Sequence, residues 1–264
     1  MTSTRLWDRA ADLPMPVDRR PRPELATLPG AGLPTVDELF TFMRDAELRF
    51  DTLRMRIEER SFTARGEHLV VVETALRHPS DARVTTSEPS LGTAGNYELW
   101  VSDGEVVRTY SGPHKLGTER PVRRGVVGIS GRESRDLPGP SRVYAPLTAL
   151  PMETLPEAFI HPAGYCQNVL ATGTCAVVGL DDVAGREAVL LTCDHPRTIE
   201  LAADRPDFTI RVWADRSDGV ILRLEESIGG VVTRDARVTD YDPDAALAPN
   251  TFDFTFPTGT TMLY

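Results

Sequence analysis

From Asp51 onward the chain consists of short runs in which apolar and polar residues alternate, separated by turn-forming residues. In the first run, LRMRIEER, the side chains of Leu53, Met55 and Ile57 would face one side of a strand and the charged residues the other. Similar runs follow as EHLVVVETAL, DARVTTSE, NYELWVSDG and EVVRTYSG, each bounded by Gly, Pro, Asn or Asp. Short strands at this spacing predict an antiparallel meander rather than a series of βαβ units.

A second block of strands is predicted toward the C-terminus. Its runs are CAVVGLDD, AGREAVLLTCD, FTIRVWAD, GVILRLEES, VTRDARVTDY and TFDFTFP, and the last places three phenylalanines on one face, which is typical of a strand. Between the blocks lie a polar loop at 128–142 and an apolar segment broken by prolines. One or two short helices are expected in that segment, with Pro156 tolerated in a first helical turn.

One helix is predicted ahead of the strands. Thr35 and Glu38 form a capping-box pair behind Pro34, and apolar residues recur at helical spacing from Val36 to Ala46. The proline-rich residues 1–34 predict an extended arm, and 35–264 a single domain. The expected fold class is mainly β (α+β): a strongly curved antiparallel sheet or half-open barrel, with the N-terminal helix and short lid helices on its concave face.

Composition and charge exclude several functions. A net charge of −10 argues against nucleic acid as a partner and against adhesion to an anionic membrane surface. No run approaches the roughly 20 apolar residues that cross a bilayer, so no stable membrane insertion is expected. The first residues lack the apolar core of a secretory signal, and a cytoplasmic location is therefore expected.

The three cysteines, Cys166, Cys175 and Cys193, are expected to be reduced thiols. Cys166 and Cys175 lie nine residues apart and could pair under oxidising conditions. Their spacing fits no standard zinc pattern, so no metal site is predicted. The sequence also lacks GxGxxG after a strand, a P-loop, GxSxG and HExxH, and no cofactor is predicted.

Few residues are candidates for catalysis. In CDHPR, Cys193 and His195 are two residues apart and would share a face of a strand, and His161 is a further candidate. The alternative is a strand that ends at His195-Pro196. The carboxylates of DRSDG at 215–219 do not match the spacing of a calcium loop, and Asp218-Gly219 predicts a hairpin turn instead.

The remaining candidate site is apolar surface. Residues expected to line a ligand cavity on the concave face are Met55, Ile57, Trp100, Tyr110, Trp213, Leu222 and Phe254, with Leu155 and Phe159 on the segment that covers them. A half-open barrel with few helices could leave such a cavity open. The alternative is an ordinary packed core, and the pattern does not choose between the two.

Several stretches resemble one family. The stretches that carry the resemblance are HPSDARVTTSEP followed by NYELWVSDGEVVRTYSG, then VVGLDDVAGREAVLLTCDHPR and IRVWADRSDGVILRLEE. The chain resembles the LolA/LolB-like proteins, which include bacterial lipoprotein carriers, regulators of the RseB/MucB kind and mycobacterial lipid-binding lipoproteins. The resemblance covers residues 35–260 and rests on structural turns. It implies an incomplete antiparallel barrel whose helices plug a hydrophobic cavity able to accept acyl chains.

The leading hypothesis is a non-enzymatic carrier or sensor that binds a hydrophobic or amphipathic, lipid-like small molecule between the sheet and its lid helices. One alternative is an enzyme of cyclase or isomerase type that acts in the same cavity on a hydrophobic intermediate. Another is a regulatory domain that contacts a protein partner through its N-terminal arm.

Overall fold

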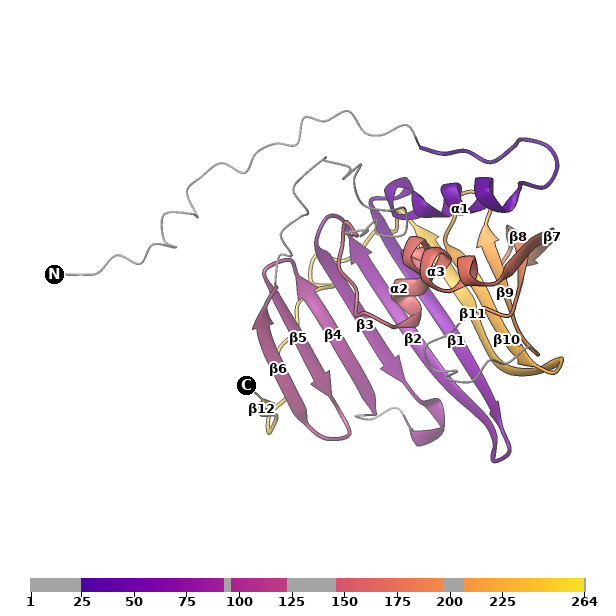
Figure 1. Ribbon diagram of the computed structural model, residues 1–264. Coiled ribbons are helices and arrows are strands. Elements are labelled where there is room, and N and C mark those ends of the chain that lie inside the picture. Colours follow the sequence, from indigo (N-terminus) through magenta and orange to yellow (C-terminus); the bar gives the residue numbers. More distant parts are fainter. Residues whose placement is uncertain (1–24, 93–95, 123–145, 197–206, 264) are drawn as a thin grey trace, which may run out of the picture.

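The computed structural model describes residues 25–92, 96–122, 146–196 and 207–263. Their strands form one twelve-stranded sheet with the order β12-β6-β5-β4-β3-β2-β1-β11-β10-β9-β8-β7 (Figure 1). The strands are β1 (Thr52–Thr63), β2 (Gly66–Arg77), β3 (Asp81–Ser87), β4 (Tyr97–Asp103), β5 (Val106–Ser111), β6 (Leu116–Pro121), β7 (Thr174–Val183), β8 (Arg186–Asp194), β9 (Phe208–Asp215), β10 (Ile221–Ile228), β11 (Val231–Pro243) and β12 (Thr261–Leu263). The predicted curved antiparallel sheet is thus confirmed.

Two meanders meet in the middle of this sheet. Strands β1–β6 follow one another along the sheet, β7–β11 do the same, and β1 pairs with both β2 and β11. All neighbouring pairs are antiparallel except β12 and β6, which run parallel. The sequence pattern predicted both meanders but missed β12 and β6, and the β6 residues LGTERP show little alternation.

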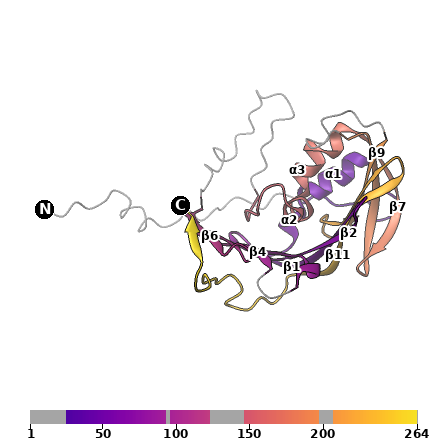
Figure 2. The ribbon, with the colours of Figure 1, turned by 90° about the horizontal axis from the view of Figure 1, so that it is seen from below.

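The helices lie on one face of the sheet, the concave one (Figure 2). Helix α1 (Val36–Arg44) begins at the predicted capping box: the Thr35 hydroxyl accepts from the Glu38 backbone N–H at 3.2 Å, and the Glu38 carboxylate accepts from the Thr35 N–H at 2.8 Å. Helices α2 (Leu155–Ile160) and α3 (Pro162–Asn168) each have proline in the first turn, where its missing N–H costs nothing. Short 3₁₀ turns complete the set: η2 (Ala46–Arg49), η3 (Pro89–Leu91) and η5 (Leu170–Thr172). None of the helices in the described part of the chain is long and apolar enough to cross a membrane.

The main core fills the space between the helices and the concave face. Leu39 and Met43 of α1, Phe159 and Ile160 of α2, and the inward side chains of β1 belong to one buried cluster. The inward residues of β1 are the predicted Leu53, Met55 and Ile57. The period-two pattern therefore identified the buried face of this strand.

The phenylalanine-rich segment is not a strand, contrary to the prediction. Residues 251–257 cross the convex face of β4–β6 without joining the sheet, on the side opposite the helices (Figure 2). Phe252, Phe254 and Phe256 still alternate inward and pack with Tyr110 and its neighbours. Gly117 of β6 leaves the necessary room, because a Cβ there would lie 2.6 Å from the Phe256 ring. The alternation was real, but it marks contact with a sheet face rather than hydrogen bonding to a strand.

The predicted division into an arm at 1–34 and a domain at 35–264 stays a prediction. Residues 1–24 of the arm and the predicted polar loop at 128–142 lie outside the described residues. Residues 25–34 run beside α1, and the Ala26 N–H donates to the Asp45 carboxylate at 3.2 Å. This part of the arm is therefore in contact with the domain.

The DRSDG stretch forms the predicted turn, between β9 and β10. Gly219 has a φ of +80°, and a Cβ at this position would lie 3.1 Å from two carbons of the Phe42 ring and 3.2 Å from the Met43 Cα. The glycine therefore provides both a left-handed backbone and the close approach of α1 to the turn.

Replacing Gly219 by alanine is expected to lower the free energy of unfolding by about 2 kcal/mol, from left-handed strain together with the crowded contact to α1. Gly230→Ala is the matched control: its φ is +77°, but nothing lies within 4 Å of its Cβ position. The control should lose about 1 kcal/mol, from backbone strain alone. Urea unfolding of both variants measures the difference, and equal losses would show that α1 does not press on the turn.

Candidate functional site

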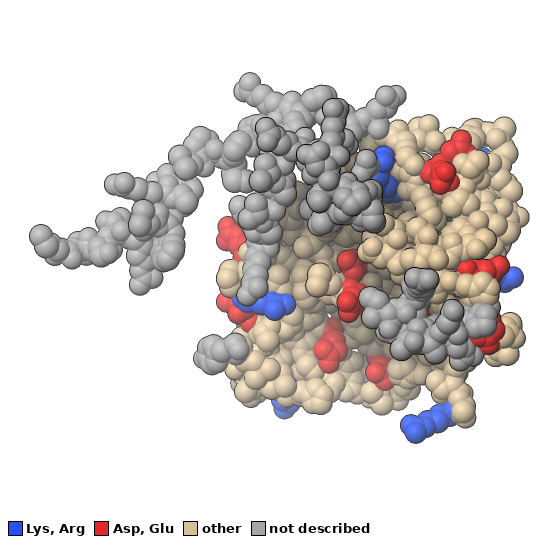
Figure 3. Space-filling view, viewed as in Figure 1, with Lys and Arg blue, Asp and Glu red and all other residues tan. Residues whose placement is uncertain are grey.

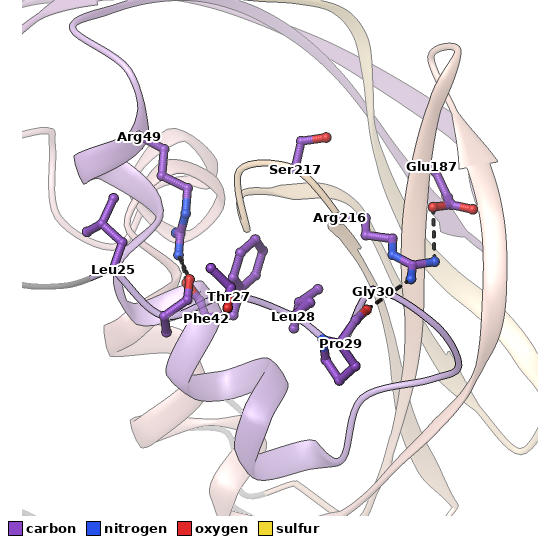
Figure 4. A pocket seen from close by; sticks show the side chains of 11 residues that line it. Leu25, Thr27, Leu28, Pro29, Gly30, Phe42, Arg49, Glu187, Arg216 and Ser217 are labelled. Carbon is purple, nitrogen blue, oxygen red and sulfur yellow. Dashed lines mark hydrogen bonds and ion pairs between the residues drawn. The ribbon is translucent and has the colours of Figure 1, made fainter.

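A pocket of about 600 Å³ lies between residues 25–30, helix α1 and the loop ends of β8–β10 (Figure 4). Its lining residues are Leu25, Ala26, Thr27, Leu28, Pro29, Gly30, Phe42, Arg49, Glu187, Arg216 and Ser217. One wall thus comes from the predicted arm and the other from the DRSDG turn. Large apolar side chains and two guanidinium groups share the lining.

Arg49 ties the walls of this pocket together. Its guanidinium donates to the carbonyls of Phe42 at 2.9 Å, Asp218 at 3.2 Å and Ala26 at 2.6 Å, and lies 4.0 Å from the centre of the Phe42 ring. Burial lowers the pKa of Arg49, while the nearby Asp45 and Asp218 oppose that shift. Three carbonyl partners make Arg49 a structural clamp between the arm, α1 and the turn.

Arg216 occupies the opposite wall with looser bonds. It donates to the Glu187 carboxylate at 3.1 Å and to the Pro29 carbonyl at 3.3 Å (Figure 4). The Glu187 side chain is 57% exposed, so this ion pair is held in a solvated setting. Arg216 is therefore the guanidinium in the pocket that could exchange its carboxylate partner for an anion on a ligand.

The carboxylates of the DRSDG turn are occupied by internal partners. Asp215, only 1% exposed, accepts from the backbone N–H groups of Ser217 and Asp218, each at 2.8 Å, and pairs with Arg186 at 2.5 and 3.1 Å. Asp218 accepts from Arg186 at 2.8 Å and from the Tyr241 hydroxyl at 3.0 Å. Burial and the neighbouring Asp215 raise the pKa of Asp218. These carboxylates hold in place the turn that forms one wall of the pocket.

Six of the residues predicted to bind a ligand lie on the helix-covered side. Met55, Ile57, Leu155, Phe159 and Leu222 are buried in one cluster, and Trp100 packs against its edge. Their side chains pack together between the sheet and the helices. Their assignment to a ligand stays a prediction.

The other three predicted residues differ in their surroundings: Trp213 belongs to the same main buried cluster, whereas Tyr110 and Phe254 belong to a second cluster on the convex face. Trp213 alternates with the inward Val212, its indole N–H donates to Asp181 at 2.9 Å, and Arg223 covers its ring at 4.5 Å. Tyr110 and Phe254 pack together on the convex face, with ring centres 5.9 Å apart. The expectation that all seven sheet residues share one face does not hold. Alternation shows that two faces differ but does not tell which is concave when aromatic residues occupy both.

The strands farther from the helices carry polar side chains on the concave face. Glu98 shares the face of Trp100, and the hydroxyls of Thr109 and Thr118 lie 2.6 Å apart beside them. Acidic side chains gather over β2–β4 in the space-filling view of this face (Figure 3).

The candidate catalytic residues have separate sets of partners. His161, with a side chain only 9% exposed, lies 3.2 Å from the Glu47 carboxylate. Cys193 is buried, and the hydrogen bond to Cys175 together with burial raises its pKa, which disfavours the nucleophilic thiolate. His195 is exposed beyond the end of β8 with a φ of +55°, so it does not share a face with Cys193 as expected. Among the described residues, no cluster of three or more His, Cys, Asp or Glu could hold a metal ion.

Comparisons with known proteins give likenesses of fold. No family model matches the sequence, and no curated protein matches it. The Pseudomonas aeruginosa MucA/MucB complex aligns over 82% of this chain and 60% of that chain, with 15% identity and a TM-score of 0.44. An uncharacterized conserved protein from Thermus thermophilus aligns over 86% and 98%, with 8% identity and a TM-score of 0.45.

A LolA superfamily protein from Nitrosomonas europaea aligns over 83% of this chain and 98% of that chain, with 9% identity and a TM-score of 0.33. The present chain spans less than two thirds of the MucB chains that it matches. These likenesses concern the fold alone.

Proposed function

We propose that the protein binds an amphipathic small molecule with an anionic head and an apolar body, as a carrier or sensor without covalent chemistry. The observation that carries this proposal is the pocket beside α1, whose volume of about 600 Å³ is typical of small-molecule sites. The proposal keeps the ligand class predicted from the sequence. It places the ligand beside α1 rather than between the sheet and helices α2 and α3.

The lining supplies two kinds of interaction. Leu25, Leu28 and Phe42 offer apolar surface, and burying such surface contributes roughly 25 cal/mol per Å² before ordering costs are subtracted. Arg216 offers a planar guanidinium that matches carboxylate and phosphate oxygens two at a time. Glu187 holds that guanidinium in the free protein. On binding, the anionic head of the ligand would take the place of the Glu187 carboxylate beside Arg216.

Binding of laurate, compared with its uncharged analogue dodecanol, tests the proposal by calorimetry. The Arg216→Gln variant is expected to bind laurate about tenfold more weakly, because a hydrogen bond to a charged group is lost, and to bind dodecanol as the parent does. Arg211→Gln is the matched control, since Arg211 is exposed and pairs with Glu225 on the convex face at 3.5 Å. The proposal that the ligand binds in this pocket would be refuted if the parent protein bound neither compound, or if both variants lost the same affinity for laurate.

The two alternatives from the sequence, an enzyme in the lid cavity and a regulatory domain that contacts a protein partner, stay predictions. Lipid extraction and native mass spectrometry of the purified protein would separate them from the proposal. A bound amphiphile released unchanged supports a carrier or sensor, whereas a chemically altered one would point to an enzyme.

A further inference from the structure

Two of the three cysteines are direct neighbours across a pair of strands. Cys175 of β7 and Cys193 of β8 are register partners in the antiparallel ladder. Residues directly opposite one another in such a ladder have Cα atoms about 4.5–5.5 Å apart and side chains on the same face. Disulfides join cysteines whose Cα atoms are about 4.4–6.8 Å apart. The backbone therefore already meets the requirement for a bond between these residues.

The thiols themselves converge on one atom. The Cys175 Sγ lies 3.2 Å and the Cys193 Sγ 3.3 Å from the carbonyl oxygen of Leu170, to which both thiols donate. Cys166 has a different sulfur neighbour, because its Sγ lies 3.8 Å from the Met43 Sδ. The pair suggested by sequence spacing, Cys166 with Cys175, is thus replaced by a pair that the strand register creates.

The two thiols differ in reactivity. Cys175 is half-buried, and the hydrogen bond from Cys193 lowers its pKa, so it is the thiol that ionises first and is open to a reagent. Cys193 is fully buried, and its hydrogen bond with Cys175 together with burial raises its pKa. An accessible thiolate next to a buried thiol is the arrangement of an attacking and a resolving cysteine.

We propose that Cys175 and Cys193 form an intramolecular disulfide when the protein meets a small-molecule disulfide such as oxidised glutathione. The Cys175 thiolate attacks one sulfur of the reagent, forming a mixed disulfide and releasing one glutathione thiolate, which takes up a proton. Cys193 then loses its proton and attacks the Cys175 sulfur, releasing the second glutathione. Two protein thiols are oxidised, one disulfide is reduced, and both protons end on glutathione.

The bond would fasten the end of the sheet. Strand β7 is the last strand in the described sheet and pairs only with β8, so its other backbone edge has no strand partner among the described residues. Cross-linking these strands should slow the opening of β7, because the strand could no longer separate from its neighbour. Hydrogen exchange of the β7 amides should therefore be slower in the oxidised protein than in the reduced one, by about tenfold or more.

Peptide mapping of the full chain after incubation with oxidised glutathione is the direct test. Trypsin leaves Cys166 and Cys175 on one peptide and Cys193 on another, whereas cleavage after Leu170 by chymotrypsin separates all three. The expected product is a single cross-link between the Cys175 and Cys193 peptides, with Cys166 still alkylated as a free thiol. A link that includes Cys166, or recovery of Cys175 and Cys193 as free thiols, would overturn the proposal.

Two variants test the order of attack. Cys193→Ala should trap glutathione on Cys175 as a stable mixed disulfide, because the resolving thiol is missing. Cys175→Ala should leave Cys193 unmodified in the folded protein, because the buried thiol is not reached. Cys166→Ala is the matched control and should still form the cross-link. Modification of Cys193 in the folded Cys175→Ala protein would contradict the assigned roles, and the mapping of the parent stands even where a variant fails to fold.

Discussion

Replacing Asp215 by alanine is expected to lower the free energy of unfolding by about 3–5 kcal/mol, as found when one partner of a buried ion pair is removed. The substitution leaves the Arg186 guanidinium with a single carboxylate, that of Asp218. It also leaves two backbone N–H groups of the turn, at Ser217 and Asp218, without their acceptor. Both donors are only part-buried, so the loss of their acceptor adds a smaller cost to that of the broken ion pair.

Urea unfolding of Asp215→Ala beside Arg54→Ala measures this difference. Arg54 pairs with Asp242 at 3.2 Å and Asp240 at 3.9 Å, but all three side chains are about half exposed, so that control should lose less than about 1 kcal/mol. Asp215→Asn should fall between the two, since its amide oxygen can still accept from the turn. If Asp215→Ala lowered the free energy of unfolding no more than Arg54→Ala, the ion-pair and hydrogen-bond network around the turn would not contribute more to stability than an exposed ion pair.

The DRSDG turn was predicted from the sequence, but its polar partners were not. Asp218-Gly219 between two alternating runs predicted the hairpin, because turn chemistry is local. The same stretch gave no hint that Asp215 would meet Arg186, which lies 29 residues earlier, or that Arg49 would bind the Asp218 carbonyl from 169 residues away. Long-range polar partners depend on the strand order, which local patterns do not contain.

The candidate pocket was missed for the same reason. Its arm-side wall, residues 25–30, has no periodicity, and proline-rich composition predicts only an extended chain. The contacts that hold this wall come from Arg49 to the Ala26 carbonyl, across 23 residues, and from Arg216 to the Pro29 carbonyl, across 187 residues. The meander, by contrast, was predicted well, because consecutive strands pair with each other through short turns.

Replacing Phe159 by alanine is also expected to lower the free energy of unfolding by about 3–5 kcal/mol. Phe159 is fully buried on α2, and α2 contacts β2 and β10 across the main core. Removing the ring would leave a cavity that neighbours from two strands and a helix cannot easily refill. Met152→Ala is the control, since Met152 lies just ahead of α2 and is 80% exposed, and it should change stability by less than about 0.5 kcal/mol.

Substitution at the same position separates the two places where a ligand could lie. If an amphiphile binds beside α1, through Arg216, the milder Phe159→Leu protein should bind laurate with unchanged affinity although it is less stable. If the ligand instead enters the space between the sheet and the helices, reshaping that space should change the affinity about threefold or more, because Phe159 would then touch the acyl chain. Laurate calorimetry on folded Phe159→Leu therefore decides between a ligand held at the edge of α1 and one held in the core. A changed affinity in this variant, with unchanged binding in Arg216→Gln, would return the ligand to the lid cavity that the sequence first predicted.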